Sequence, residues 1–462
     1  MHRTLAFLAL GLCLTASAGP ASGQVGVRAK PHRPFSMVDT ADGLGHLPPP
    51  NYPASSYSGP VYQYTSFSMS IGDGWPENVL VAEPLPAPTG PVPLLVVFHK
   101  FGSSQLDLSV NTNFAQEGCS RGWYVVCPLA ANTQHYGSIP SQVHMEAVLQ
   151  EMLVRYPLID PSRIYGAGFS MGGGAMTNYA ARHLDPSKPM LAAMVSLSGA
   201  VALKDTYASD PPTRVFLDFW YGNGTAGSAD PFKMARSSII NFDQATLQVH
   251  AGEDLARNLS HIPLQVTRAT DEKIWYLPRQ NDVLVGHLAS LGFTPGPTYA
   301  YRFVPFGQDA FDHRWVMLDQ AWACDWLSTF TLTLPTAART LADRDDVYFH
   351  FFVEQDAPNA FTPFDWSLDA QGNALSLAAT ANLRRLTVDT LAAGLDPAQP
   401  LQLSLATADG LGDEVVLRGY AAPPTTILRD GQATASWSFD APTQRLVLVE
   451  TDGQPHLWSI AP

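Results

Sequence analysis

The feature that most constrains this chain is a glycine–serine–glycine turn between a predicted strand and a predicted helix. Residues 168–172 form the pattern G-x-S-x-G around Ser170, after the strand-like run 163–167 and before a helix-like run that begins at residue 173. In this context the turn presents the serine hydroxyl at the carboxyl edge of a parallel sheet. Glycines flank the serine because the strained turn leaves no room for β-carbons. The pattern therefore predicts a nucleophilic serine on an α/β sheet.

A dinucleotide-binding turn and a purely structural turn are two other interpretations of this segment. Gly166 and Gly168 begin like G-x-G-x-x-G, but the third glycine position holds Met171, and no acid ends the next strand, residues 191–197. Without that acid nothing is placed to bind a ribose hydroxyl, so a nucleotide site is disfavoured. A structural turn, or a fold that has lost its chemistry, stays open until partners for Ser170 are identified.

A candidate acid and a candidate base for Ser170 follow it in the sequence. Their order, serine then acid then histidine, is the order found in enzymes built on this kind of α/β sheet. Asp271 follows the strand-like run 264–267, and His313 follows the next one, 299–304. Because the carboxyl ends of parallel strands meet at one edge, we expect both side chains to lie near Ser170. The sequence thus predicts a triad of Ser170, Asp271 and His313.

Other histidines and acids compete for these two roles. His261 precedes its strand and so belongs to the opposite edge, and His287 lies inside the predicted helix 278–291. Asp282 lies in the same helix, from which a carboxylate reaches a strand-edge histidine poorly. Glu272 is directly adjacent to Asp271. Asp271 is the preferred acid, with Glu272 and Asp282 as alternatives.

An oxyanion hole needs two backbone N–H groups aimed at the developing alkoxide. The residue after the nucleophile, Met171, supplies one of them. The second is expected from the loop after the apolar strand 93–98, where Phe101 is the predicted donor and Lys100 the alternative. His99 in the same loop is interpreted as a brace that hydrogen-bonds the loop.

The rest of the sequence divides into segments that differ in their pattern of apolar residues. Residues 65–335 alternate apolar strands with amphipathic helices, which is typical of a mostly parallel sheet with helices on both faces. Residues 201–260 interrupt this alternation without clear periodicity and are interpreted as an insertion. Residues 340–462 contain only short strand-like runs, which predicts a C-terminal all-β, sandwich-like domain.

The N-terminus is typical of a secretory signal. Arg3 precedes an apolar run over residues 5–14 and a small-residue cleavage motif at 16–18, so residues 1–18 are predicted to be a signal peptide and the protein to be secreted. Residues 19–64, rich in Pro, Gly and Ser, are interpreted as an extended lead. A disulfide between Cys119 and Cys127, or three unpaired thiols including Cys324, are both open.

Charge and hydropathy narrow the range of partners. The 462 residues include 41 acids against 27 Lys and Arg, a net charge of −14, which disfavours nucleic acid and anionic membranes as partners. Beyond the N-terminus no apolar run is long enough to span a membrane. The H-E-x-x-H and paired C-x-x-C patterns are missing from the sequence, so neither a metal nor a cofactor is expected.

Three segments of the chain, residues 96–102, 160–173 and 269–272, together resemble the α/β-hydrolase superfamily. More narrowly, they are similar to secreted carboxylesterases of the polyhydroxybutyrate-depolymerase and feruloyl-esterase type. Members of that group carry an aspartate, a proline and an arginine shortly before the turn that holds the serine, as at Asp160, Pro161 and Arg163. They also carry a histidine at the start of the loop that supplies the second oxyanion-hole donor, as at His99. The likeness covers about residues 65–332 and departs at Lys100, where members usually have glycine.

This resemblance implies an α/β-hydrolase fold and ester cleavage through an acyl-enzyme on Ser170, and it leaves the substrate, a small or polymeric ester, undefined. A secreted peptidase of the prolyl-oligopeptidase type and a non-catalytic binding protein are the alternatives. Such peptidases normally carry a β-propeller ahead of the hydrolase, for which the lead is too short, since one blade takes about 40 residues.

Two features have open interpretations. The aromatic residues Phe216, Phe219 and Trp220 of the insertion form either a wall over Ser170 or a small core of their own. The C-terminal domain either contacts carbohydrate or polymer, or only packs on the hydrolase domain.

Overall fold

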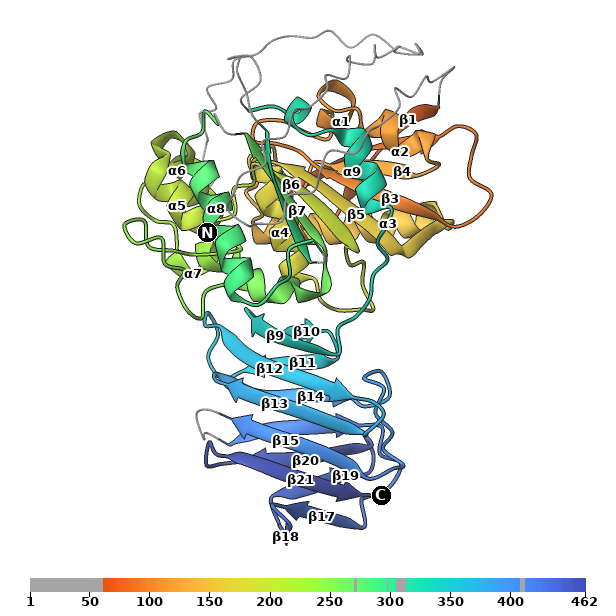
Figure 1. Ribbon diagram of the computed structural model, residues 1–462, viewed down its shortest axis with the longest axis vertical. Coiled ribbons are helices and arrows are strands. Elements are labelled where there is room, and N and C mark those ends of the chain that lie inside the picture. Colours follow the sequence, from red (N-terminus) through yellow and green to blue (C-terminus); the bar gives the residue numbers. More distant parts are fainter. Residues whose placement is uncertain (1–60, 270–271, 297, 305–312, 408–411) are drawn as a thin grey trace, which may run out of the picture. The chain divides into compact units, whose positions relative to one another are not determined.

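The computed structural model describes residues 61–269, 272–296, 298–304, 313–407 and 412–462 (Figure 1). Within these residues the first sheet is eight-stranded, in the order β1-β2-β4-β3-β5-β6-β7-β8. β2 pairs antiparallel with β1 and β4, and the other neighbours are parallel. Its strands are β1 (Tyr62–Ser70), β2 (Pro76–Pro84), β3 (Val92–Phe98), β4 (Tyr124–Pro128), β5 (Ile159–Phe169), β6 (Ala193–Leu197), β7 (Leu264–Ala269) and β8 (Tyr299–Val304). The predicted mostly parallel sheet is confirmed.

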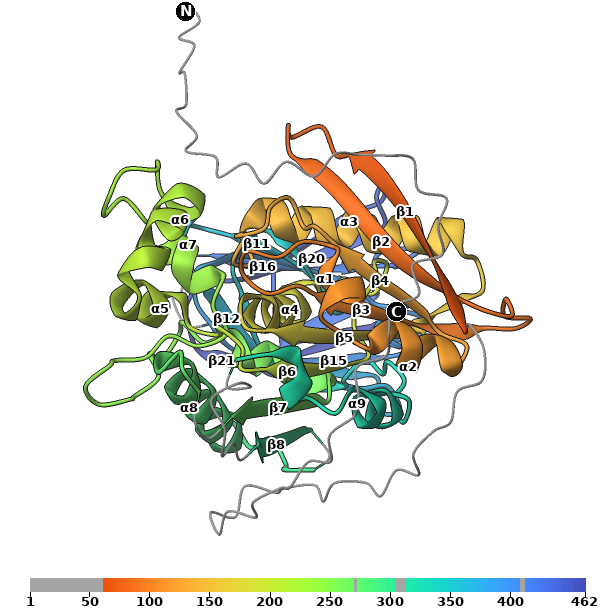
Figure 2. The same ribbon diagram turned by 90° about the horizontal axis from the view of Figure 1, so that it is seen from above.

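Helices cover both faces of this sheet (Figure 2). Buried side chains of α3, α4 and α8 pack on one face, and those of α2 and α9 pack on the other. The central strands β3 and β6 are therefore buried on both faces, which is why they are apolar without alternation. The helices are α1 (Asp107–Val110), α2 (Phe114–Ser120), α3 (Ile139–Arg155), α4 (Met171–Arg182), α5 (Leu203–Ser209), α6 (Pro211–Tyr221), α7 (Pro231–Arg236), α8 (Tyr276–Ser290) and α9 (Gln320–Leu327), with 3-10 turns η1 (Leu255–His261) and η2 (Trp315–Met317).

The predicted insertion, residues 201–260, is more regular than its sequence indicated, because it contains α5, α6, α7 and η1. The helices α5 and α7 have only seven and six residues, too few for a helical period to be visible in the sequence, and prolines in the first turn start α6 and α7. The sequence also predicts a helix over residues 314–330, and the helix in the structure, α9, is shorter. Asp319 accepts the Trp322 amide at 3.1 Å and caps α9, which begins at residue 320.

The C-terminal part is all β, as predicted (Figure 1). Among the described residues it forms a six-stranded sheet, β10-β11-β14-β16-β20-β19, and a seven-stranded sheet, β18-β17-β21-β15-β13-β12-β9. Inward side chains of both sheets, such as Leu386 and Leu403, share one core. The strands are β9 (Ala337–Ala342), β10 (Asp346–Tyr348), β11 (Phe351–Gln355), β12 (Thr362–Asp369), β13 (Ala374–Thr380), β14 (Leu383–Asp389), β15 (Leu401–Thr407), β16 (Asp413–Arg418), β17 (Thr426–Arg429), β18 (Gln432–Ala433), β19 (Trp437–Asp440), β20 (Arg445–Glu450) and β21 (Pro455–Ala461).

The first strand of the β domain is hydrogen-bonded to the part of the chain that forms the eight-stranded sheet and its helices. The Asn258 side chain acts as a strand partner for Leu341: Leu341 N–H donates to its Oδ1 at 2.7 Å, and its Nδ2 donates to the Leu341 carbonyl at 3.0 Å. Buried Asp343 accepts from Arg182 Nε at 3.0 Å and from Arg236 Nε at 2.8 Å. These contacts hold the turn after β9 against α4, η1 and the end of α7.

The three cysteines of the described chain, Cys119, Cys127 and Cys324, are buried free thiols. The disulfide that the sequence left open between Cys119 and Cys127 is therefore not formed. Burial raises the pKa of each thiol above its usual value, so these cysteines act as small apolar side chains. Within the described residues, no helix is long and apolar enough to cross a bilayer.

Candidate active site

Ser170 lies at the sharp turn between β5 and α4, as the sequence predicted. Its backbone has φ 56° and ψ −122°, a conformation that serine adopts only under constraint. A β-carbon on Gly168 would lie 2.5 Å from the Gly172 carbonyl oxygen, and one on Gly172 would lie 2.1 Å from the Phe98 carbonyl oxygen. The flanking glycines are thus required by the close approach of neighbouring backbone.

His313 is paired with a buried carboxylate, and that carboxylate belongs to Glu272. The distance between His313 Nδ1 and Glu272 Oε1 is 2.8 Å. Glu272 Oε1 also accepts the Ile274 amide at 3.2 Å, and its Oε2 accepts the Ser198 hydroxyl at 2.8 Å. Because a carboxylate only accepts, Nδ1 of His313 carries the proton and Nε2 is left as the basic nitrogen. The ring is further held against Phe169, with centroids 4.5 Å apart.

The predicted acid, Asp271, lies outside the described residues, so its role stays a prediction. Glu272, which the sequence offered as an alternative, contacts His313 directly. Asp282 is engaged elsewhere: Arg268 Nη2 donates to its Oδ2 at 3.0 Å, and Tyr301 donates to its Oδ1. The rival base His261 is buried in η1, its Nδ1 3.0 Å from the Asn258 carbonyl oxygen, and burial lowers its pKa to about 4.

Ser170 and His313 line one cavity of about 420 Å³. Much of its wall is aromatic: Phe101 contacts Phe216 edge to face at a centroid distance of 5.2 Å, and Tyr136 at 5.7 Å. Phe216 therefore lies in the wall of the cavity that Ser170 lines, which is one of the two interpretations that the sequence allowed for this residue. Phe219 and Trp220 instead pack on Trp75, with centroids 5.9 and 5.1 Å away, and are not among the residues that line the cavity.

The predicted oxyanion-hole donors are the amides of Met171, which follows Ser170, and Phe101, which lines the cavity. Among the residues that the structure describes, nothing accepts from the N–H groups of Met171 or Phe101. The alternative donor, Lys100, is engaged: its amide donates to Asp107 Oδ2 at 3.2 Å, and its Nζ lies 3.0 Å from Oδ1. The ring nitrogens of His99 lie 2.9 Å from the Lys100 carbonyl oxygen and 3.0 Å from the Leu129 carbonyl oxygen, and the protonated nitrogen donates, which agrees with the interpretation of His99 as a brace.

Buried Asp107 is the anchor of this loop. Burial opposes its ionisation, but the Trp315 indole, which donates to Oδ2 at 2.9 Å, and the charge of Lys100 hold the pKa of Asp107 below its usual value. An ionised Asp107 therefore joins the Phe101 loop to the segment after His313.

A second buried network supports the loop that carries Gln134 and Tyr136 into the cavity. Glu77 accepts the amides of Leu129, Ala130 and Ala131 at 2.8, 3.2 and 3.0 Å. His144 lies 2.8 Å from Glu77 through Nδ1 and 2.9 Å from Asp73 through Nε2. Although burial lowers it, hydrogen bonding to the two carboxylates raises the pKa of His144 above its usual value overall.

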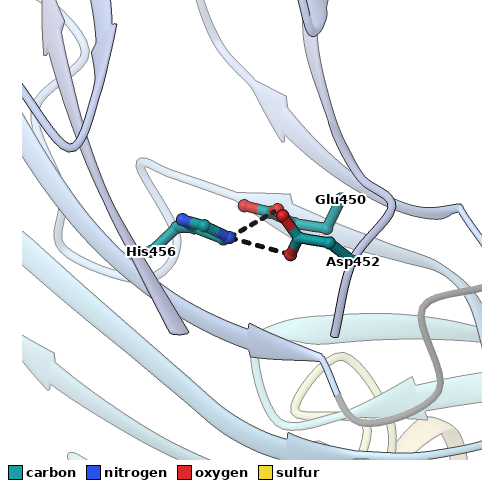
Figure 3. A group of neighbouring side chains, drawn as sticks. All are labelled: Glu450, Asp452 and His456. Atoms are coloured by element: carbon teal, nitrogen blue, oxygen red, sulfur yellow. Dashed lines mark hydrogen bonds and ion pairs between the residues drawn. The ribbon is translucent and has the colours of Figure 1, made fainter. Parts of the chain in front are cut away.

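The described residues contain one group of potential metal ligands, Glu450, Asp452 and His456 of the β domain (Figure 3). Cationic side chains already neutralise it. His456 lies 2.6 Å from Asp430 and 2.8 Å from Asp452, and Arg429 lies 2.7 Å from Glu450 and 3.1 Å from Asp452. Both ring nitrogens of His456 face carboxylates, which raise its pKa although burial lowers it. The cluster therefore fits an ion-pair network and not a metal centre.

The sheet order and the serine elbow together define the α/β-hydrolase fold, followed here by a β-sandwich-like domain. No family model and no curated protein matches the chain. Solved structures match part of it. The fluorophosphonate-binding serine hydrolase FphF of Staphylococcus aureus, in a substrate-bound form, is 16% identical over 58% of this chain and 99% of its own, with a TM-score of 0.44.

Two other solved structures carry different activities in their names. A ferulic acid esterase is 16% identical over 58% of this chain and 96% of its own, with a TM-score of 0.40. An acylaminoacyl peptidase of Pyrococcus horikoshii is 14% identical over 60% of this chain and 43% of its own, with a TM-score of 0.42. At such low similarity, the activity of this chain has to be argued from its own site.

Proposed function

We propose that this protein is a serine hydrolase that cleaves carboxylic esters through an acyl-enzyme on Ser170. The observation that carries the proposal is the pairing of His313 with buried Glu272 beside a cavity that both His313 and a strained Ser170 line. A histidine held by a carboxylate, at the same cavity as a serine on a sharp turn, is the arrangement that activates a serine nucleophile. A structural glycine turn accounts for none of these partners.

Each residue has one role in the proposed reaction. Ser170 Oγ attacks the ester carbonyl carbon while His313 Nε2 takes the hydroxyl proton, and the amides of Met171 and Phe101 bind the oxyanion. Collapse of the tetrahedral intermediate expels the alcohol, which receives that proton from His313. Water then repeats the sequence on the acyl-enzyme and releases the carboxylic acid. Glu272 keeps Nδ1 protonated and stabilises the imidazolium.

Covalent labelling tests the proposal most directly. A fluorophosphonate probe should label the folded protein at Ser170, because an activated serine attacks the phosphorus, and Ser170→Ala should remove the label. Labelling should also fall strongly in His313→Ala, which keeps the serine but removes its base. A folded wild-type protein that is not labelled would contradict the proposal and favour a non-catalytic binding protein.

The aromatic wall supports esters of extended apolar or aromatic acids as the substrate class. Phe101, Tyr136 and Phe216 give the cavity apolar surface beside the nucleophile. We expect Phe216→Ala to lower kcat/KM for a p-nitrophenyl hexanoate or a feruloyl ester by about 10-fold or more, because burying a large apolar side chain is worth about 1.5–3 kcal/mol. The acetate ester, too short to use the wall, should change little.

The same assay separates esterase from peptidase. A dipeptidyl amide and a polyester film are tested beside the soluble esters, and amide cleavage that rivals the best ester would contradict the ester assignment. If Phe216→Ala affects acetate and hexanoate equally, the wall does not determine specificity. Secretion, and contact of the C-terminal domain with carbohydrate or polymer, remain proposals that rest on the sequence alone.

A further inference from the structure

The cavity beside Ser170 contains a carboxylate that the proposed reaction does not use. Asp210 joins the end of α5 to the start of α6 and lines the same cavity as Ser170 and His313. Its side chain accepts no amide at the start of α6, so it does not cap that helix. The carboxylate is oriented by other groups.

The two oxygens of this carboxylate have different surroundings. Oδ2 accepts the Tyr276 hydroxyl at 3.0 Å and the Thr213 hydroxyl at 2.8 Å. Oδ1 has no hydrogen-bond partner among the residues that the structure describes, and none of their cationic side chains forms an ion pair with Asp210. Burial raises the pKa of Tyr276, and the charges of Tyr136 and Asp210 add to that shift, so Tyr276 stays protonated and keeps donating. Asp210 is therefore a fixed carboxylate with one open acceptor oxygen.

Among the described residues that line the cavity, none with a fixed positive charge is free to balance Asp210. The cationic side chain in the cavity wall, Lys100, is already paired with Asp107 at 3.0 Å. A donor that reaches the open oxygen of Asp210 gains a charge-assisted hydrogen bond. A carboxylate in this position rejects anionic acyl groups and favours groups that carry a hydrogen-bond donor.

We propose that Asp210 is a recognition group for a hydrogen-bond donor, an ammonium or a hydroxyl, on the part of the substrate remote from the scissile ester. This inference rests on the proposed function, because it takes the ester carbonyl of the substrate to bind at Ser170. The aromatic wall then binds the chain between the two ends, with the carbonyl at Ser170 and the donor at Asp210. The protein is expected to prefer acids with a polar terminus to plain alkyl acids of equal length.

Matched esters test the preference. Methyl esters of hexanoic, 6-hydroxyhexanoic and 6-aminohexanoic acid, and their eight-carbon analogues, are compared on the wild type and on Asp210→Asn. The asparagine keeps an acceptor for Tyr276 and Thr213 and removes the charge. For at least one of the two chain lengths, the wild type should prefer the amino ester to the alkyl ester by about 10-fold or more, because a hydrogen bond to a charged group is stronger than one between neutral groups.

The variant distinguishes the two donors. Asp210→Asn should remove the preference for the amino ester, reduce that for the hydroxy ester less, and leave kcat/KM for the alkyl ester within about twofold. Asp243→Asn, which makes the same charge change at an exposed position of the same insertion, should alter none of these ratios. A wild type that shows no preference for either donor at both lengths, or a preference that Asp210→Asn leaves intact, would overturn the inference.

A binding measurement separates this inference from the proposed function. Hexylammonium and hexanol are titrated by calorimetry into Ser170→Ala and into Ser170→Ala with Asp210→Asn. Binding of hexylammonium that the second substitution weakens about 10-fold supports the Asp210 site even if no ester is hydrolysed. Absence of hexylammonium binding to Ser170→Ala overturns the site even if the wild type hydrolyses esters.

Discussion

At the scale of single residues, the acid of the triad is the assignment most open to a direct test. Glu272→Gln would place an amide N–H against His313 Nδ1, so the ring would favour the tautomer that carries its proton on Nε2 and could not accept the Ser170 proton. We expect kcat for a p-nitrophenyl ester to fall by about 10⁴-fold with little change in melting temperature. Asp271→Asn is the matched control one residue away and should be mild. A severe Asp271→Asn beside a mild Glu272→Gln would restore the acid that the sequence predicted.

The residues also show how far sequence reasoning extends. The elbow could be predicted because its requirement is local: G-x-S-x-G between a strand and a helix allows few other structures. The choice of acid is not decided by a local pattern, because Asp271 and Glu272 are adjacent in the sequence; Glu272 lies against His313, and Asp271 is outside the described residues. Asp210 belongs to no sequence motif, and its place in the cavity depends on the hydrogen bond from Tyr276, at the start of α8, to Asp210, at the start of α6.

At the scale of elements, strands were easier to predict than the helices of the insertion. Strands such as β3 and β6 are buried on both faces, so their continuous apolar composition indicated them clearly. The helices α5 and α7 have only seven and six residues, too few to reveal a period, whereas α6 lines the cavity through Thr213 and Phe216. The loop that carries Tyr136 depends on a buried network formed by Glu77, at the start of β2, and His144 in α3, two residues 67 positions apart, which no local pattern indicates.

This element-scale network predicts a pH-dependent stability. The raised pKa of His144 means that the folded protein holds the proton more tightly than the unfolded chain. Its stabilising contribution is complete below the ordinary histidine pKa of about 6.5 and is lost as pH rises through the higher pKa of the folded state. The loss of unfolding free energy in His144→Gln should therefore be larger at low than at high pH, measured by urea denaturation between about pH 5.5 and 8.5. Equal losses at both ends of that range would show that His144 stabilises the loop only by packing.

At the scale of the whole molecule, the boundary between the predicted domains 65–335 and 340–462 has physical consequences. A fragment that begins at residue 340 would lack the first half of β9, a strand of the seven-stranded sheet, so a cut near Pro335 is the better division. The β domain has a core of its own, although Leu184 and Met190 of the hydrolase part also pack in that core. We expect a 335–462 fragment to unfold cooperatively but at lower denaturant than in the full chain.

The ion pairs of Asp343 with Arg182 and Arg236 allow a numerical estimate of how much the rest of the chain stabilises the β domain. Asp343 is 2% exposed and Arg182 is 1% exposed, and although burial opposes ionisation, the charges of Arg182 and Arg236 hold the pKa of Asp343 well below its usual value. Asp343→Asn in the full chain leaves Arg182 buried without its partner, which should cost about 3–5 kcal/mol of unfolding free energy. The 335–462 fragment contains neither arginine, so there the same substitution should change stability by less than about 1 kcal/mol. Parallel denaturation of the four proteins decides the point: an equal cost in the chain and in the fragment would mean that Asp343 stabilises its own turn, through Tyr348, and does not join the two parts of the molecule.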